Sequence, residues 1–514
     1  LNSSRAAHRG RQHRWESQAG RPFRPLRPPN GEVWGRVANL RLPSPAIGRR
    51  SPYEMAPPTL RGVADASAGI LQPELSTINL ALCVVLLSWL VVEAVFYAWY
   101  VLALRRAQAR VCPPRLSLED REFLLNKMLK NAEDYGMWRQ IKGWFLTQDR
   151  DSTHSPHEVG SEDLLELLAW AFFYKRVEDL DAEETAWVEF SRGKICEDFK
   201  LDLRLRPGRT GVIAVRHTLD QIHAIHRPLV FYMAIQAAYA LHGFLLRARG
   251  FHRGRHKGLK YWYRLDQLGR EQRPSQEALS GQDADVLVFF HGIGLGLLLY
   301  LPLLLRLRVP NQILFEMPWI AMNPFADIPS STEYAQWVAE VLTQRKVERC
   351  VALGHSFGSL PIAWLVRQHP SQVSRCILVD PVCIFLNLPD VCVNFLYKHP
   401  RTMFGKMMRL FGAREFGIAK TLMRHFFWTD NVLFPEQLPA GSSVILMGND
   451  RILPVKDIYT FSSRLPSLHT EVIPNLDHGH FLVWPSACTK VLEHVDACFG
   501  SLQKAAALER QDSP

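Results

Sequence analysis

The chain has 514 residues, of which 47% are hydrophobic and 22% are charged, and its formal net charge is +11. This composition excludes a chain that is disordered throughout, and the length allows one large domain with extensions or two domains. Residues 1–54 contain eleven arginines and three glutamates, so they carry +8 of the charge and leave +3 for the rest. The remaining chain therefore gives no signal for nucleic-acid binding.

The N-terminal segment is rich in Arg, Pro, Gly and Ser and shows no apolar periodicity. Segments of this composition bury too little apolar surface to fold, so residues 1–75 are predicted to be a disordered tail. The first methionine is Met55, and two interpretations stay open: translation starts at Met55, or the basic segment is a targeting sequence.

A long apolar stretch follows at residues 78–104, and Arg105 and Arg106 come directly after it. At about 1.5 Å per residue, this stretch is long enough to cross a hydrocarbon core of about 30 Å. We therefore predict a transmembrane helix at residues 76–106, with a buried helix of a soluble domain as the alternative. Glu93 interrupts the stretch, which requires its carboxyl group to be protonated, paired or functional.

The arginines after this helix set its predicted orientation, because positive charge favours the cytosolic side of a membrane. If translation starts at Met55, they place the rest of the chain in the cytosol on a single-pass anchor held by membrane lipid. A second uncharged stretch, residues 228–246, is predicted to be a buried or membrane-skimming helix. A second membrane span at this stretch stays open as the alternative.

Residues 107–256 are predicted to form a helical region, in which Ser117 followed by Glu119 and Asp120 is typical of a helix start. This region contains no catalytic motif. The nine cysteines of the chain are scattered and include no Cys-x-x-Cys pair. Their pattern argues against a disulfide framework or a structural zinc site and fits a reducing compartment.

From about residue 257, short apolar runs alternate with helical segments, which is typical of a mostly parallel sheet with helices on both faces. The predicted strands are 286–290, 312–315, 350–353, 375–379, 443–447 and 470–473. An α/β domain is therefore predicted at residues 257–502, with a helical cap at about 385–438 and a flexible tail at 503–514. The Phe and Met side chains of the cap suit acyl chains or a membrane face, and they equally suit the cap's own core.

The pentapeptide Gly354-His355-Ser356-Phe357-Gly358 fits Gly-x-Ser-x-Gly and lies between a predicted strand and a predicted helix. A nucleophile elbow requires this setting, with glycines where bulkier residues would collide. Ser356 is therefore the candidate nucleophile, and a chance match in a loop is the alternative.

An activated serine also requires donors that bind the oxyanion formed on its substrate. The segment His291-Gly292-Ile293-Gly294 comes directly after a predicted buried strand. We expect the backbone N–H groups of Ile293 and Phe357 to form the oxyanion hole. An ordinary glycine turn is the alternative for the first of these segments.

The serine further needs a base and an acid that orients the base. Asp450 closes a predicted strand and is the candidate acid, with Asp380 and Asp457 as rivals. Two histidines follow the last strand, and we take His478 as the candidate base, with His480 as its rival. A metal held by the two histidines would need further ligands, and no carboxylate or cysteine cluster supplies them, so no metal is predicted.

These motifs resemble those of the α/β-hydrolase fold superfamily, over about residues 257–500. The motifs that carry the resemblance are His291-Gly292-Ile293-Gly294, Gly354-His355-Ser356-Phe357-Gly358, Gly448-Asn449-Asp450 and His478-Gly479-His480-Phe481. The resemblance implies an α/β-hydrolase fold with a cap, and a Ser-His-Asp hydrolase without a bound cofactor. Many relatives carry Asp-x-Pro-Gly after the second strand, whereas this chain has Glu316-Met317-Pro318-Trp319, which predicts a different substrate mouth.

The predicted function is that of a membrane-anchored serine hydrolase that cleaves an ester, with a lipid or another small apolar acyl compound as its substrate. No nucleic-acid partner is predicted. Two alternatives stay open: an acyltransferase or thioesterase with the same triad, and a catalytically inactive hydrolase-like membrane scaffold.

Overall fold

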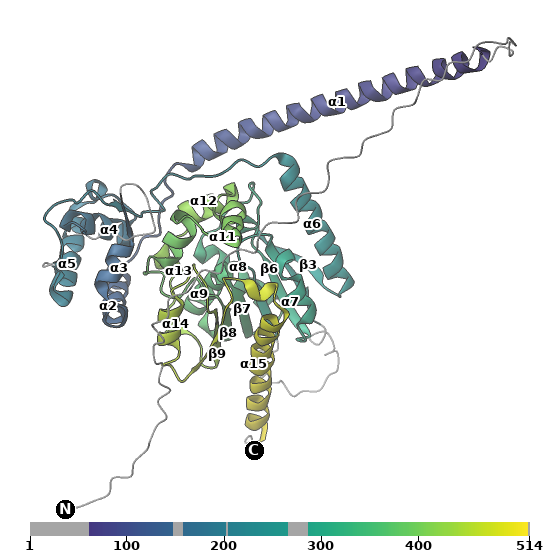
Figure 1. The fold of residues 1–514 in the computed structure, drawn as a ribbon. Coiled ribbons are helices and arrows are strands. Elements are labelled where there is room, and N and C mark those ends of the chain that lie inside the picture. Colours follow the sequence, from purple (N-terminus) through teal and green to yellow (C-terminus); the bar gives the residue numbers. More distant parts are fainter. Residues whose placement is uncertain (1–60, 148–157, 202–203, 266–285, 512–514) are drawn as a thin grey trace, which may run out of the picture. The chain divides into compact units, whose positions relative to one another are not determined.

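The computed structural model describes residues 61–147, 158–201, 204–265 and 286–511. The chain divides into two compact units, residues 1–79 and 80–514 (Figure 1). Helix α1 (Arg61–Ala107) begins well before residue 76, where the transmembrane helix was predicted to start. Alanines at alternate positions from Ala64 to Ala68 favour this early helix. The rest of the predicted disordered tail lies outside the described residues.

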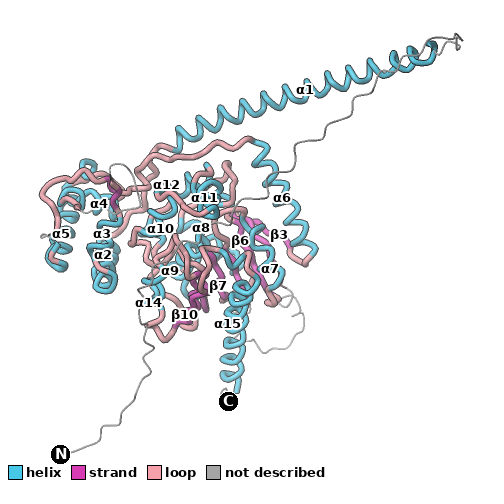
Figure 2. Tube along the Cα trace, in the orientation of Figure 1, coloured by secondary structure: helices cyan, strands magenta, loops and turns pink. Residues whose placement is uncertain are grey.

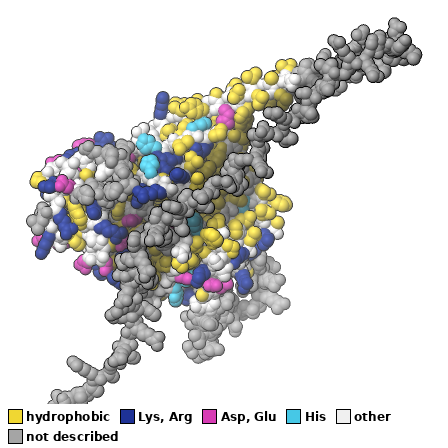
Figure 3. Space-filling model, in the orientation of Figure 1, with side chains coloured by type: hydrophobic (Ala, Val, Ile, Leu, Met, Phe, Trp, Pro, Cys, Tyr) yellow, Lys and Arg dark blue, Asp and Glu magenta, His cyan; other side chains and the backbone are white. Residues whose placement is uncertain are grey.

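Two helices are long and apolar enough to cross a membrane, judged by length and composition only: residues Asn79–Ala107 of α1, and α6 (Leu229–Ala248). The apolar side chains of α1 are largely exposed, from Leu80 to Leu102, and Figure 3 shows hydrophobic atoms along this helix. In contrast, α6 buries one face, which includes Ile235, while apolar side chains of its other face are exposed. This half-buried state agrees with the skimming helix that the sequence favours.

Glu93 joins these two helices. Its carboxylate accepts hydrogen bonds from the backbone N–H groups of Leu229 (2.9 Å) and Val230 (3.3 Å). The first N–H groups of a helix have no partner inside that helix. Of the three possibilities for Glu93, the structure shows pairing, because its carboxylate caps the start of α6.

The region between α1 and α6 is mostly helical. It contains α2 (Leu118–Tyr135), α3 (Met137–Gly143), α4 (Ser161–Phe173), α5 (Ala182–Phe199) and a small antiparallel pair, β1 (Phe145–Leu146) with β2 (Ile213–Ala214). Ser117 caps α2 by accepting the Asp120 N–H, as the sequence predicts. This region shares a hydrophobic core with the cap, and the Trp428 indole of the cap donates to the Ala171 carbonyl. The helical region therefore supports the cap.

An eight-stranded sheet in the order β10-β9-β8-β7-β5-β6-β4-β3 forms the centre of the body (Figure 2). Its strands are β3 (His252–His256), β4 (Leu259–Arg264), β5 (Val286–Phe290), β6 (Asn311–Glu316), β7 (Cys350–His355), β8 (Val373–Val379), β9 (Ser442–Met447) and β10 (Leu468–Ile473). Neighbours among β5 to β10 pair in parallel, whereas β4 is antiparallel to both β6 and β3. The predicted mostly parallel sheet is confirmed.

Alternating side chains of the strands form two cores, one on each face of the sheet. In β5, Leu287 and Phe289 belong to one core, while Val288 and Phe290 belong to the other. The first core includes side chains of α7 (Leu301–Arg306) and α15 (Pro485–Gln511), and the second those of α8 (Ser331–Gln344), α9 (Ser359–Gln368) and α14 (Val455–Ser462). Because both faces are covered, the central strands are apolar without interruption.

Strands β3 and β4 begin before residue 257 and were not predicted. Their polar residues, as in His252-Arg253-Gly254-Arg255-His256, suit an exposed sheet edge and hide the strand pattern. The cap is inserted between β8 and β9, as predicted. It contains α10 (Asp390–Cys392), α11 (Met403–Met408), α12 (Phe416–Arg424) and α13 (Trp428–Asn431). At the C-terminus, α15 continues to Gln511, so the predicted flexible tail is helical there, because residues 505–510 are strong helix formers.

Candidate active site

Ser356 lies on a sharp turn between β7 and α9. Its φ of 54° falls in the left-handed region, which is rare and strained for a residue other than glycine. A Cβ atom on Gly354 would lie 2.6 Å from the Gly358 carbonyl oxygen, and one on Gly358 would lie 2.1 Å from the Phe290 carbonyl oxygen. The turn therefore requires glycine on both sides of the serine.

We expect Gly358→Ala to lower the free energy of unfolding by about 1–3 kcal/mol, because the added methyl group must displace the backbone of β5. Displacement of the elbow should also slow labelling of Ser356 by a serine-reactive probe. Denaturant unfolding followed by circular dichroism measures the first effect. Gly193→Ala in α5 is the matched control, since a Cβ there meets nothing within 4 Å. Equal stability of the two variants would contradict the tight elbow.

The structure brings Ser356, His478 and Asp450 together in one hydrogen-bonded chain. The Ser356 Oγ is 2.8 Å from Nε2 of His478, and Nδ1 of His478 is 2.5 Å from Oδ2 of Asp450. Because the Asp450 carboxylate only accepts, Nδ1 of His478 carries a proton and Nε2 is free to accept the serine proton. All three side chains are buried. This geometry is that of a nucleophile, a base and an orienting acid.

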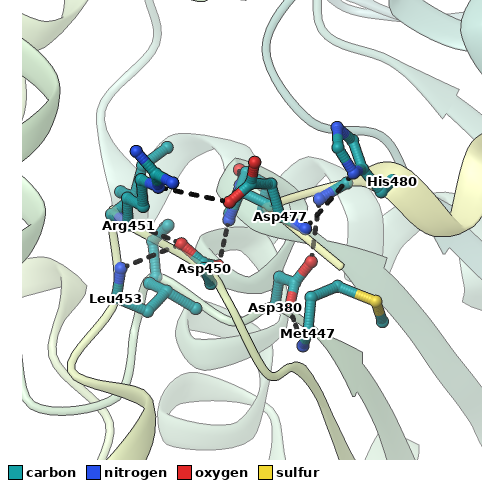
Figure 4. A network of polar contacts seen from close by, with 12 residues as sticks. Asp380, Met447, Asp450, Arg451, Leu453, Asp477 and His480 are labelled. Carbon is teal, nitrogen blue, oxygen red and sulfur yellow. Dashed lines mark hydrogen bonds and ion pairs between the residues drawn. The ribbon is translucent and has the colours of Figure 1, made fainter. Parts of the chain in front are cut away.

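Asp450 is held rigidly by the start of the loop that follows it. Its Oδ1 accepts the backbone N–H groups of Ile452 (2.7 Å) and Leu453 (3.1 Å), which leaves Oδ2 for the histidine (Figure 4). Of the two rival acids, Asp457 lies in α14 and pairs with Arg139 instead.

Asp380 is the second buried carboxylate near His478, and it bonds to the backbone. Its two oxygens accept the N–H groups of Met447 (2.7 Å) and Gly479 (2.9 Å), so it ties the histidine loop to the end of β9 (Figure 4). Asp380 also has a positive φ of 44° at the end of β8. It therefore supports the base from behind, without a hydrogen bond to its ring.

The two carboxylates change the pKa of the histidine between them. Burial alone would lower the pKa of His478, but the charge and hydrogen bond of Asp450 and the charge of Asp380 outweigh burial and raise it to about 9. Burial raises the pKa of Asp380 to about 7, and repulsion from Asp450 adds to this rise. The site therefore stabilises the imidazolium that forms when His478 takes the serine proton.

His480, the rival base, lies away from Ser356. Its Nδ1 accepts the Asp477 N–H at 3.2 Å, and its ring packs against Phe404 of the cap with centroids 4.5 Å apart (Figure 4). The intervening Gly479 has a positive φ of 73°, which turns the chain between the two histidines. His480 therefore lines the substrate cavity beside the cap.

The glycine loop after β5 is fixed by His291. Nδ1 of His291 donates to the Gly292 carbonyl (2.8 Å), and Nε2 accepts the Met317 N–H (2.9 Å), which sets the neutral tautomer. Burial lowers the pKa of His291 to about 4, in agreement with an uncharged ring. Ile293 and Phe357 both line the cavity that contains Ser356, so the two predicted oxyanion donors lie at the same site.

Sequence reasoning missed a link between this loop and the elbow. The Tyr300 hydroxyl accepts the Gly292 N–H (2.7 Å) and, with its acceptor site used, donates to Nδ1 of His355 (2.6 Å). His355 occupies a variable position of the motif, and burial holds its pKa well below the ordinary value. No sequence pattern identifies Tyr300, because its partner is 55 positions away.

A cavity of about 740 Å³ opens over Ser356 and His478. Its walls come from the cap, the glycine loop and α6. None of the described residues that line it is Asp, Glu, Lys or Arg. The apolar lining includes Phe231, Ile235, Leu298, Met407, Phe411 and Phe426. A cavity of this kind suits a long apolar group.

The aromatic and methionine side chains of the cap divide between the two predicted roles. Phe404, Met407 and Met408 line the cavity. Phe427 and Trp428 instead pack against the helical region in the cap's own core. Both interpretations of this composition therefore apply, to different side chains.

The departure at Glu316-Met317-Pro318-Trp319 does not reach the cavity. Glu316 accepts the indole N–H of Trp262 at 2.7 Å, on the strand β4 side, and none of the four residues lines the cavity. The predicted effect of this segment on the substrate mouth is wrong, because its side chains face the edge of the sheet and the core. Its one link to the site is the Met317 N–H that orients His291.

Among the described residues, one group of His, Cys, Asp and Glu has the spacing of metal ligands, namely Asp380, Asp450 and His478. Their ligand atoms already take part in hydrogen bonds with one another or with backbone N–H groups. The group is therefore accounted for by the triad and its support.

The order of the sheet and the places of the three residues decide the fold. Ser356 follows the central strand β7, Asp450 follows β9, and His478 follows β10, all at the carboxyl ends of parallel strands. The chain has an α/β-hydrolase fold. Its nucleophile elbow, glycine loop and cap occupy the positions that this fold gives them.

Solved α/β-hydrolase structures resemble this chain over about half of its length. A bacterial membrane phospholipase A is 16% identical and covers 54% of this chain and 97% of its own, with a TM-score of 0.35. Carboxylesterase CesB from Bacillus subtilis is 16% identical (52% and 97% covered, TM-score 0.34), and naproxen esterase from the same organism is 18% identical (47% and 87%, TM-score 0.32). A scan against protein-family models found no match, and neither did a search of curated proteins.

Proposed function

We propose that this α/β hydrolase is a membrane-anchored serine hydrolase that cleaves the ester of an apolar acyl compound. One observation carries the proposal: the hydrogen-bonded chain of Ser356, His478 and Asp450 opens into an apolar cavity of about 740 Å³. A triad supplies the chemistry, and the cavity supplies space for an acyl chain.

In the first half of the reaction, Ser356 Oγ attacks the ester carbonyl carbon while Nε2 of His478 takes its proton. The new bond gives a tetrahedral intermediate, which collapses as His478 returns the proton to the leaving alkoxide. A water molecule then repeats these steps on the acyl-enzyme and releases the acid. Asp450 holds the ring of His478 and stabilises its charged form throughout.

The backbone N–H groups of Ile293 and Phe357 are the proposed donors to the oxyanion. Each such donor lowers the barrier by roughly 2.7–4 kcal/mol when it points at the developing charge. The bonds from His291 and Tyr300 to the glycine loop hold the first donor in place. Positioning of this kind is useful because the loop then pays no reorganisation cost in the transition state.

The proposed anchor is α1, with the catalytic body on the cytosolic side. Its exposed apolar length ends at Arg105 and Arg106, which favour the cytosolic face of a membrane. Helix α6 lies against the body and exposes Met233, Leu241 and Phe244 on its free side, so we place it in the membrane interface. This arrangement keeps the cavity, which α6 helps to line, close to lipid.

The deciding experiment is labelling of the full chain in detergent with a fluorescent fluorophosphonate, beside Ser356→Ala. We expect the wild type to be labelled and the variant not to be. Equal labelling of both would exclude Ser356 as the nucleophile. A folded wild type that is not labelled would favour the inactive scaffold. Product analysis of a labelled enzyme, with and without an added alcohol, then separates hydrolysis from acyl transfer.

A further inference from the structure

A second cavity, of about 540 Å³, meets the apolar cavity at the catalytic histidine. Both cavities are lined by His478 and by the same cap side chains, Phe395, Phe404 and Met408. The linings otherwise differ in chemistry. The apolar cavity has no Asp, Glu, Lys or Arg among its described lining residues, whereas half of the charged side chains around the second cavity are basic.

The basic side chains of the second cavity come from the cap. They are Lys398, Arg401 and Arg409, and among the described residues none of them forms an ion pair with a carboxylate. The Arg409 guanidinium donates to the Lys398 carbonyl at 2.7 Å, and Lys398 Nζ donates to Asn394 Oδ1 at 3.4 Å. Burial, with repulsion from Arg414, lowers the pKa of Arg409. These cations therefore lie together without a protein anion to balance them.

The acidic side chains of the same cavity have other partners or a reduced tendency to ionise. Asp450 accepts from His478, and Asp477 pairs with Arg451 at 3.5 Å (Figure 4). Burial raises the pKa of the third acid, Asp390. The positive charge of the cap residues is therefore left for a ligand.

The position of His478 between the cavities assigns one part of an ester to each. The histidine must hand its proton to the leaving alkoxide, so the alcohol part of the substrate lies next to Nε2. An acyl chain fits the apolar cavity on the side of Ile293 and Phe357. The alcohol part then extends past His478 toward the basic cavity.

We propose that the alcohol part of the substrate carries a phosphate group, which Lys398, Arg401 and Arg409 bind in the second cavity. This inference rests on the proposed function and names its substrate class, an acyl ester of a phosphorylated alcohol. The ester C–O bond breaks, the acyl group passes to Ser356 and then to water, and the phosphorylated alcohol leaves with its phosphate ester intact. Arginine and lysine are the side chains that recognise phosphate best.

The test compares two substrates that differ only in the phosphate: 1-oleoylglycerol 3-phosphate and 1-oleoylglycerol, each in neutral detergent micelles with the full chain. We expect the wild type to prefer the phosphate ester in kcat/KM by about tenfold or more, since charge-assisted hydrogen bonds are at stake. The double variant Lys398→Gln with Arg401→Gln should lose this preference through KM and keep its rate on the neutral ester. Lys406→Gln is the matched control, because Lys406 is exposed on α11 and lines neither cavity.

Two further arms keep the outcomes separate. Binding of 1-oleoylglycerol 3-phosphate to Ser356→Ala, and to the same variant with both cap substitutions, measures the site without turnover. Oleoyl-coenzyme A, preferred over 1-oleoylglycerol 3-phosphate, would place the phosphate on a thioester carrier instead of a lipid. Equal rates on the phosphate and neutral esters, with Ser356 labelled by a fluorophosphonate, would overturn this inference alone. Loss of binding to phosphatidylserine vesicles by the double variant, with the substrate preference unchanged, would also overturn it and assign these cations to the membrane surface.

Discussion

His478→Ala should lower kcat/KM for an ester substrate by about 10⁴-fold, whereas His480→Ala should change it by less than about tenfold. The first substitution removes the group that is 2.8 Å from the Ser356 hydroxyl, and no other base takes its place. The second removes a ring that packs on Phe404 at the cavity wall. Hydrolysis of p-nitrophenyl esters of several chain lengths measures both effects.

The two histidine variants also control for each other. They lie two positions apart in one loop, so a general disturbance of the loop would affect both rates alike. Fluorophosphonate labelling should fall with the rate in His478→Ala and persist in His480→Ala. A larger loss in His480→Ala than in His478→Ala would show that the loop rearranges in the working enzyme.

The second large effect concerns the two buried carboxylates. We expect Asp450→Asn to lower kcat by about 10⁴-fold, because an amide nitrogen facing Nδ1 of His478 would favour the wrong tautomer of the ring. Asp380→Asn should lower kcat by about tenfold at most, because Asp380 has no hydrogen bond to the ring. Instead, the new amide leaves one of the N–H groups of Met447 and Gly479 unpaired, which should cost about 1–3 kcal/mol in unfolding free energy.

The pH dependence of kcat/KM separates these roles further. The base acts only when it is neutral, so kcat/KM rises with pH through the pKa of His478 in the free enzyme. Since the carboxylates raise that pKa above 6.5, to about 9, the rise in the wild type should lie on the alkaline side of 6.5. Removal of either negative charge should move it to lower pH. A rise at unchanged pH in Asp380→Asn would show that Asp380 is uncharged in the free enzyme.

The pairing of the two carboxylates also explains why Asp380 was a credible rival in the sequence. Both acids close a parallel strand and therefore lie at the same edge of the sheet as Ser356. What separates them is the direction of one side chain: Oδ2 of Asp450 points at Nδ1 of His478, while both oxygens of Asp380 point at backbone N–H groups. Directions of this kind depend on loops from three strands and leave no local pattern.

Several features were predictable because their causes are local. The elbow is one, since the steric crowding around Ser356 arises from neighbours within a few residues and from the strand just before it. The six central strands are another, because burial on both faces demands continuous apolar residues. The capping of α2 by Ser117 has the same local character. In contrast, β3 and β4 lie at the edge of the sheet, where polar side chains are tolerated, so they escaped prediction.

The sequence by itself determined the fold class, the candidate nucleophile and a short choice of acids and bases, because strand, turn and helix patterns are encoded by adjacent residues. Only the tertiary structure decided which histidine meets Ser356 across 122 positions, and which aspartate meets that histidine. It also joined His355 to the glycine loop through Tyr300, and made two cavities of opposite chemistry meet at His478. These features depend on how distant loops converge at one edge of the sheet, and that convergence is set by packing of the whole chain.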